Sequence, residues 1–205
     1  MAYNLKKFQT DAEYSAATLN YPAVSWVVSG DTIHFDKTEP TPPTFQGKWL
    51  ATYTGGTTAS AECDSTSAIT MGEIENSYDV ESIEIGDCVT EIGVWLFDRC
   101  YNLTSVTFGN NVTTIGELAF DGSSLTSIDI PDSVTSIGNR AFADCGGLAS
   151  VTVNSTTPPT LGSDVFADTS IAYDEGYIYV PAESVNLYKE ANGWSDYASN
   201  IVAIS

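Results

Sequence analysis

The chain has 205 residues, of which 42% are hydrophobic, so it can bury the core of one large domain or two small ones. Seven Lys and Arg against 27 Asp and Glu give a formal net charge of −20, which excludes binding to nucleic-acid phosphates and docking on an anionic membrane. No stretch reaches the ~18–20 apolar residues of a membrane span. No apolar segment follows Lys6 and Lys7, so we expect no membrane insertion and no signal peptide.

Residues 1–37 are predicted to form a small α+β adaptor at the N-terminus. A capping box at Thr10–Glu13 predicts a short helix, and alternation on both sides of Ser29–Asp31 predicts a hairpin. Residues 38–47 are rich in proline and are predicted to be a stiff linker. His34, the single histidine, lies in the predicted hairpin, where nothing in the pattern selects a nucleophile beside it, so we expect a surface histidine rather than a catalytic one.

Residues 48–77 are predicted to be a hairpin cap. Trp49–Tyr53 alternates, a Gly-Gly turn follows, and Thr58–Cys63 returns. This hairpin would cover the open end of the repeats described next, because an uncapped stack exposes apolar edges. For Cys63 and Cys88 we expect two free thiols, with a bridge that ties the cap to the first coil as the alternative.

A repeat of 22–23 residues fills residues 78–170. Its units begin at Val80, Leu103, Leu125 and Leu148, which are 23, 22 and 23 residues apart. Three further columns keep this register, one of Ile or Leu, one of Gly and one of Phe: Ile92, Ile115, Ile137, Leu161; Gly93, Gly116, Gly138, Gly162; Phe97, Phe120, Phe142, Phe166. The agreement of independent columns indicates a repeated structural unit.

Each unit begins with apolar residues two apart, such as Ile128 and Ile130, which is the period of a short strand. A polar turn follows, and the Ile-Gly-x-x-Ala-Phe segment predicts a short helical turn that returns across the core. A single coil cannot bury its apolar face, whereas coils stacked at about 4.8 Å can. The pattern therefore predicts about four coils of a solenoid.

These units resemble the BspA-like class of leucine-rich repeats, with the consensus L-T-S-I-x-I-P-x-S-V-T-S-I-G-x-x-A-F-x-x-C. Residues 125–145 match it almost letter for letter, and the ending at 171–205 is similar to the strand-helix close of the same class. The resemblance implies a mainly β leucine-rich-repeat solenoid with short helical turns. It also implies that Cys100 and Cys145 pack inside the coils beside the Phe column, whereas Ser123 and Thr169 depart from the consensus.

Two surfaces are candidate binding sites. The outward positions of the predicted strands form a strip of small polar groups that suits a glycan or protein, with a plain solvated face as the favoured alternative: Ser82, Glu84, Ser105, Thr107, Ser127, Asp129, Ser150, Thr152. On the return side, Trp95 and Leu118 stand at exposed positions of adjacent coils, with Tyr101 at a nearby corner. Exposed apolar pairs mark interfaces, so we expect a partner there, and packing against the adaptor is the alternative.

Catalytic and metal chemistry find little support in the residue pattern. Glu84 and Asp129 share an outward column two coils apart, roughly 9–10 Å, which would suit an inverting glycosidase. An open sheet face gives neither carboxyl group a raised pKa, however, so glycoside hydrolysis is a remote alternative. The acidic excess is assigned to solvated charge rather than to calcium, and no cofactor or metal is expected.

The sequence therefore predicts a non-catalytic recognition, adhesion or structural module on an external assembly, with a protein or a surface glycan as its partner. The repeat class implies bacterial surfaces or gut-phage appendages. Virion proteins need no export signal, so we favour a phage head-fibre or tail protein over a bacterial cell-surface adhesin. Residues 1–47 would then serve homo-oligomer or virion assembly.

Overall fold

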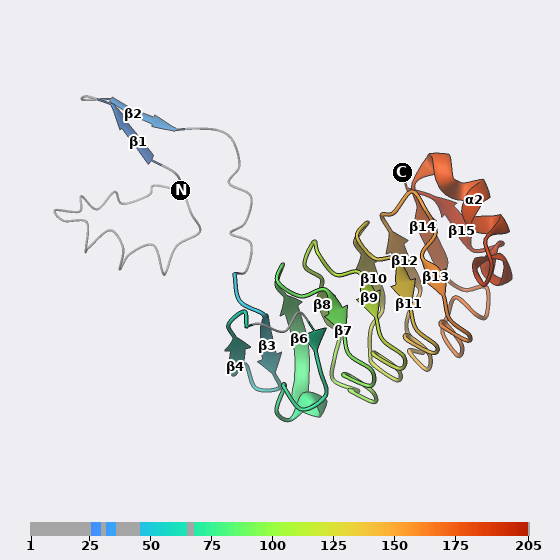
Figure 1. Ribbon diagram of the computed structural model, residues 1–205, viewed down its shortest axis with the longest axis horizontal. Coiled ribbons are helices and arrows are strands. Elements are labelled where there is room, and N and C mark those ends of the chain that lie inside the picture. The colour runs from blue at the N-terminus through green and yellow to red at the C-terminus, as the bar shows by residue number, and fades with distance from the viewer. Residues whose placement is uncertain (1–25, 30–31, 36–45, 65–67, 205) are drawn as a thin grey trace. The chain divides into compact units, whose positions relative to one another are not determined.

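The computed structural model describes residues 26–29, 32–35, 46–64 and 68–204, and divides the chain into two units, Met1–Thr44 and Phe45–Ser205 (Figure 1). In the first unit, β1 (Trp26–Ser29) and β2 (Thr32–Phe35) pair antiparallel, with Val27 opposite His34. The predicted hairpin is therefore present. The capping box and most of the proline-rich segment lie outside the described residues.

The second unit is a solenoid whose coils each contribute a strand to one face (Figure 1). These strands run parallel in two ladders that meet between β8 and β10: β6 (Val80–Ile85) and β8 (Ser105–Thr107); β10 (Ser127–Ile130), β12 (Ser150–Val153), β14 (Tyr177–Val180) and β15 (Ile201–Ala203). In register, Ile83 pairs with Val106 and Ile128 with Val151, so each step is one repeat. The leucine-rich-repeat solenoid predicted from the sequence is confirmed.

A third parallel ladder runs across the coils and is built from two-residue strands: β5 (Ala68–Ile69), β7 (Glu91–Ile92), β9 (Thr114–Ile115), β11 (Ser136–Ile137) and β13 (Thr160–Leu161). Single turns, rather than longer helices, follow each of these strands. The physical reason is the backbone. In the first coil Trp95 and Arg99 have φ of 59° and 56°, which a right-handed helix does not allow.

The repeated glycines are required by the close stacking of the coils. A Cβ atom at Gly116 would lie 2.7 Å from the carbonyl oxygen of Ile92, and one at Gly138 would lie 2.5 Å from the amide nitrogen of Glu117. Both distances are shorter than van der Waals contact with backbone atoms that cannot move away cheaply. The Gly column therefore sets how closely each coil can stack on its neighbour.

The core is a column of phenylalanine rings. Phe97, Phe120, Phe142 and Phe166 are buried, and consecutive ring centroids lie 5.5, 5.4 and 5.9 Å apart with interplanar angles of 11°, 4° and 11°. A second buried column follows three residues later in each coil: Cys100, Ser123, Cys145, Thr169. The repeat thus buries the same two positions in every coil, whichever small side chain occupies the second.

A hairpin closes the N-terminal end of the solenoid. Strands β3 (Trp49–Tyr53) and β4 (Thr58–Ala61) pair antiparallel, and β3 also pairs antiparallel with β6, with Ala51 opposite Ile83. Beneath the hairpin, Lys48 is buried and its Nζ forms ion pairs of 2.8 Å with Glu73 and 3.2 Å with Asp64. The short 3-10 helix η1 (Ser77–Asp79) leads into β6.

Cys63 and Cys88 form a disulfide, which corrects the expectation of two free thiols. Cys63 follows β4 and Cys88 lies in the turn after β6, and their Cα atoms are 6.1 Å apart. The hydrogen bond from the Gly86 N–H to the Lys48 carbonyl, 2.9 Å long, holds that turn against the start of the hairpin. The cap is therefore covalently fixed to the first coil.

The C-terminal end is closed by the 3-10 helices η2 (Ala182–Ser184) and η3 (Trp194–Tyr197) and by α2 (Val185–Glu190). Buried Trp194 donates from Nε1 to the Pro159 carbonyl at 2.8 Å, and its ring lies 6.3 Å from Phe166. Strand β5 lies before the predicted repeat region at 78–170, and β14 and β15 continue the ladder of β12 beyond it. The stack of strands is therefore longer than this region. Within the described ranges, no helix is long and apolar enough to cross a membrane.

Candidate functional site

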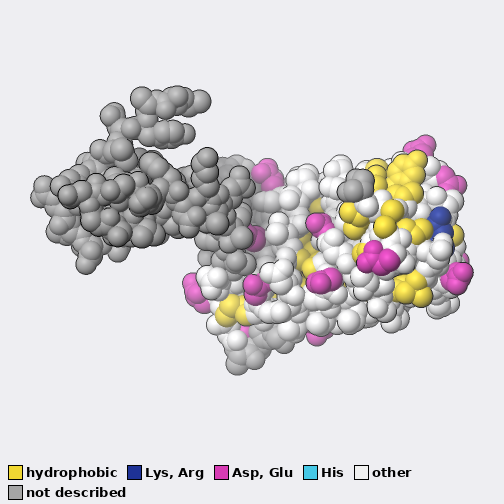
Figure 2. All heavy atoms as spheres, turned by 90° about the horizontal axis from the view of Figure 1, so that it is seen from above, with side chains coloured by type: hydrophobic (Ala, Val, Ile, Leu, Met, Phe, Trp, Pro, Cys, Tyr) yellow, Lys and Arg dark blue, Asp and Glu magenta, His cyan; other side chains and the backbone are white. Residues whose placement is uncertain are grey.

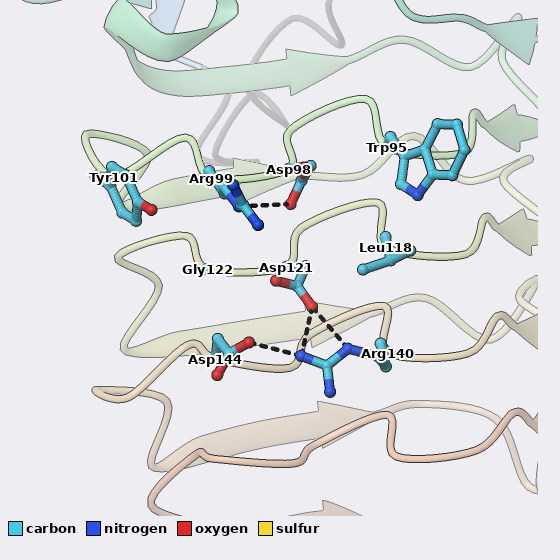
Figure 3. A pocket seen from close by; sticks show the side chains of 9 residues that line it. All are labelled: Trp95, Asp98, Arg99, Tyr101, Leu118, Asp121, Gly122, Arg140 and Asp144. Atoms are coloured by element: carbon cyan, nitrogen blue, oxygen red, sulfur yellow. Dashed lines mark hydrogen bonds and ion pairs between the residues drawn. The ribbon is translucent and has the colours of Figure 1, made fainter.

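The three residues predicted as an apolar interface line one hollow of about 440 Å³ on the return side of the coils (Figure 3). Five charged side chains and a glycine complete its lining, which spans the first three coils: Asp98, Arg99, Asp121, Gly122, Arg140, Asp144. We call this feature the return-side hollow. The return-side hollow places exposed apolar side chains beside donors and acceptors of hydrogen bonds.

The hollow lies where the repeat is irregular. Four residues lie between Phe120 and Leu125, whereas five lie between Phe97 and Leu103 and between Phe142 and Leu148. In this shortened corner Gly122 takes the left-handed position, with φ of 69°, that Arg99 and Asp144 occupy in the flanking coils. The second coil thus offers no side chain at a position where its neighbours do, which leaves the space open.

Two aromatic side chains stand at opposite ends of the hollow (Figure 3). Trp95 is 49% exposed and Tyr101 is 67% exposed, while Leu118 is half-buried below Trp95. Trp and Tyr side chains are enriched where proteins bind ligands or partners.

The floor of the hollow is an ion-pair network across the second and third coils. Arg140 Nε donates to Asp121 Oδ2 at 3.2 Å, and Arg140 Nη2 donates to Asp144 Oδ2 at 2.6 Å. Burial raises the pKa of the Asp121 carboxyl, and the nearby carboxylates of Asp144 and Asp98 raise it further, against the lowering effect of Arg140. Asp121 is therefore a buried acceptor that its arginine partner compensates only in part.

Both arginines of the chain line this hollow. The Arg99 side chain is 71% exposed, and its contact with Asp98 is 4.0 Å long. Among the described residues, no hydrogen bond involves the Arg99 guanidinium or Arg140 Nη1. In a region with so few cations, these two groups are donors available to a bound molecule.

The predicted polar strip lies on the outward side of the strands. The predicted positions are half-buried on β6 and β12 and exposed on β8 and β10. The strip continues onto β14, where Tyr177 and Tyr179 have ring centroids 6.3 Å apart, although the sequence analysis did not include them. Figure 2 shows one face of the second unit, with scattered acidic side chains and hydrophobic groups gathered towards the C-terminal end.

The two carboxylates considered for glycoside hydrolysis do not share a hollow. Glu84 is half-buried on β6 and Asp129 is exposed on β10, in separate ladders with β8 between them. Asp129 Oδ1 accepts a hydrogen bond of 2.6 Å from Asn154. No group of three His, Cys, Asp or Glu side chains is placed to hold a metal ion in the described part of the chain.

A second hollow, of about 680 Å³, lies against the cap hairpin. Trp49 and Tyr53 of β3, residues 58–61 of β4 and the acidic Glu73, Glu75 and Asp79 line it. The buried Trp49 Nε1 has no hydrogen-bond partner among the described residues. This hollow has neither the exposed aromatic pair nor the arginine side chains of the first one.

The three apolar residues of the return-side hollow were predicted from the sequence, whereas its charged residues were not. Asp98, Arg99, Asp121 and Asp144 stand one or two residues after the Phe column, so an additional column comparison would have located them. Gly122 departs from Arg99 and Asp144 in that column, which is the signal for open space. The ion pairs between coils required the structure.

The family described as BspA type leucine-rich repeat region matches residues 67–191 in six copies, two more than the four coils predicted. A leucine-rich cell surface protein from Faecalibacterium prausnitzii is 36% identical over 47% of this chain and 25% of its own, with a TM-score of 0.43. A leucine-rich repeat protein from Bacteroides ovatus is 18% identical over 77% and 53%, with a TM-score of 0.36. The chain thus spans a quarter and about half of the lengths of these two proteins, and no curated protein matches it.

Proposed function

The chain belongs to the BspA-type leucine-rich repeat family, and from that premise we propose that it is a non-catalytic recognition module that binds its partner in the return-side hollow. The observation that supports this proposal is the meeting of Trp95, Tyr101 and both arginines in one hollow. Trp, Tyr and Arg are the residues that contribute most to binding energy at protein surfaces. The predicted positions of the polar strip, by contrast, line neither of the two hollows described.

The module works outside the cytosol. The Cys63–Cys88 disulfide supports this setting, because disulfides persist in oxidising surroundings and Cys63 is exposed to solvent. Two settings fit: an appendage of a phage virion, which the sequence analysis favours, and a bacterial cell surface. Mass spectrometry of purified virions and of proteins released from intact cells by protease distinguishes them, because the chain would be found in one fraction and not in the other.

The test of binding uses the fluorescently labelled full chain on intact bacterial cells and on beads coated with host mucin or matrix proteins. The double variant Trp95→Ala/Tyr101→Ala removes the exposed aromatic groups, and alanine keeps the Cβ that the backbone at φ 59° already accommodates at Trp95. Tyr177→Ala is the matched control, because Tyr177 is 52% exposed and lies on the strand face. We expect binding to fall about tenfold or more in the double variant and to persist in the control.

Two results would contradict the proposal. Equal binding by the wild type and the double variant would place recognition elsewhere on the molecule. Loss of binding in Tyr177→Ala alone would assign recognition to the strand face. Glycoside hydrolysis is tested separately, since an activity lost in Glu84→Gln/Asp129→Asn would show that the module is an enzyme.

A further inference from the structure

We propose that the ligand of the return-side hollow is a neutral saccharide. This inference rests on the proposed function and names the chemical class of its partner. It follows from three properties of the hollow: an exposed aromatic surface, hydrogen-bonding groups of both kinds, and a charge that disfavours ions.

The aromatic rings require a ligand with an apolar surface. Trp95 is half exposed at one end of the hollow and Leu118 lies beside it (Figure 3). The C–H groups on one side of a pyranose ring form such a surface, and covering the indole with it removes apolar area from water. Tyr101 at the other end adds a second ring with a hydroxyl group, which can donate or accept.

The polar groups of the hollow require a ligand that both donates and accepts hydrogen bonds. Asp98 and Asp144 have side chains that are 34% and 48% exposed, and their carboxylates only accept. The guanidinium of Arg99 and Nη1 of Arg140 only donate. A hydroxyl group does both, so neighbouring hydroxyls of one sugar ring can donate to the carboxylates and accept from the guanidinium groups.

The charge of the hollow disfavours ionic ligands. The hollow holds two arginines and three aspartates, and residues 46–204 carry four basic against 22 acidic side chains. An anionic ligand would meet this negative field, and a cationic ligand would compete with Arg140 for Asp121 and Asp144. A neutral ligand is neither repelled by the negative field nor in competition with Arg140.

The size of the hollow favours a small ligand over a protein surface. Its volume of about 440 Å³ falls within the range of about 300–1,000 Å³ typical of small-molecule sites. A stable protein partner needs about 800 Å² on each side, which would extend well beyond the aromatic and arginine groups that distinguish this site. A protein partner is therefore an outcome of the test rather than the proposal.

The probe is a set of immobilised neutral oligosaccharides, with sialylated and sulfated oligosaccharides as the charged comparison. We expect the full chain to bind at least one neutral oligosaccharide, with an affinity that changes little between 50 and 500 mM NaCl, because no ion pair forms with the ligand. Trp95→Ala should weaken this binding about tenfold, the effect of losing one ring contact. Arg99→Ala removes a donor from an exposed side chain and should also weaken it.

Gly122→Asn tests the hollow without removing any of its binding groups. Asparagine tolerates the left-handed backbone at φ 69°, and its Cβ would lie 3.6 Å from Arg99 Cα and 3.7 Å from Tyr101 Cε1, which are ordinary contacts. The rest of the side chain then fills the space between them, so saccharide binding should be lost while the melting temperature stays close to that of the wild type. Tyr177→Ala is again the control that should bind normally.

The outcomes separate the inference from the proposed function. Binding restricted to charged oligosaccharides, or neutral binding that Gly122→Asn leaves intact, overturns the neutral-saccharide inference. Binding of a protein or cell surface that the hollow variants abolish, with no neutral oligosaccharide bound, overturns the inference and leaves the proposed function standing. If the hollow variants change no binding of any kind, both fail.

Discussion

Breaking the disulfide between Cys63 and Cys88 should destabilise the N-terminal cap by several kcal/mol. The two cysteines are 25 residues apart in the chain, and for a loop of that length the chain-entropy relation gives about 3.5 kcal/mol at 25 °C. The loop contains β5 and the Glu73 partner of Lys48, so its loosening would also release the buried ion pair. We therefore expect the cap to unfold first when the bond is absent.

The assay is urea unfolding followed by tryptophan fluorescence, with Trp49 reporting on the cap. With urea slopes of about 2–3 kcal/mol per molar, 3.5 kcal/mol lowers the midpoint by about 1–2 M. Reduced wild type and the double variant Cys63→Ser/Cys88→Ser should share the lower midpoint, and reductant should not change the midpoint of the double variant. If wild type unfolds at the same urea concentration with and without reductant, the bond does not hold the cap and this reasoning is wrong.

Three further predictions concern the core and its ionisable groups. Phe142→Ala should cost about 3–5 kcal/mol, because the ring stacks between two others, and an unshifted melting curve would show that the Phe column is not the core. Because the pKa of Asp121 is raised, the folded state binds its proton more tightly than the unfolded state, and the contribution of this group to stability falls as pH rises above the unfolded pKa. Asp121→Asn should therefore be more favourable relative to wild type at pH 7 than at pH 3, and a difference that is constant with pH would contradict this. Burial raises the pKa values of Cys100 and Cys145 to about 11, so a thiol reagent at pH 8 should find no reactive thiol in the native protein and two after unfolding without reductant.

The repeat made most of the solenoid predictable from the sequence. The spacing of Val80, Leu103, Leu125 and Leu148 fixed the step of the ladder, and the Phe and Gly columns identified the buried ring and the close contact between coils. The return segment was predicted as a short helical turn, and its apolar spacing could not indicate that residues such as Leu118 adopt the left-handed backbone. Side-chain periodicity carries no information about the sign of φ when the residue is not glycine.

The site was predictable only for side chains that stand out from the repeat in the sequence. Trp95 and Tyr101 are conspicuous in a polar repeat, so their exposure could be expected. The network of Asp121, Arg140 and Asp144 joins two coils, and its pairing depends on which way each side chain turns. The disulfide was missed for a similar reason, because the path of the chain after β4 decides whether Cys63 approaches the first coil.

A perfectly regular solenoid presents the same side chains in every coil, so a coil that differs gives one place on its surface a distinct chemistry. Here the second coil is one residue shorter at its corner and has Gly122 where its neighbours have Arg99 and Asp144. The missing side chain opens the hollow, and the flanking coils supply the aromatic rings and both arginines around it. The stacked phenylalanines continue beneath without interruption, so the irregularity shapes the surface while the core keeps its packing. In this protein the departure from the repeat, rather than the repeat itself, is where binding specificity can arise.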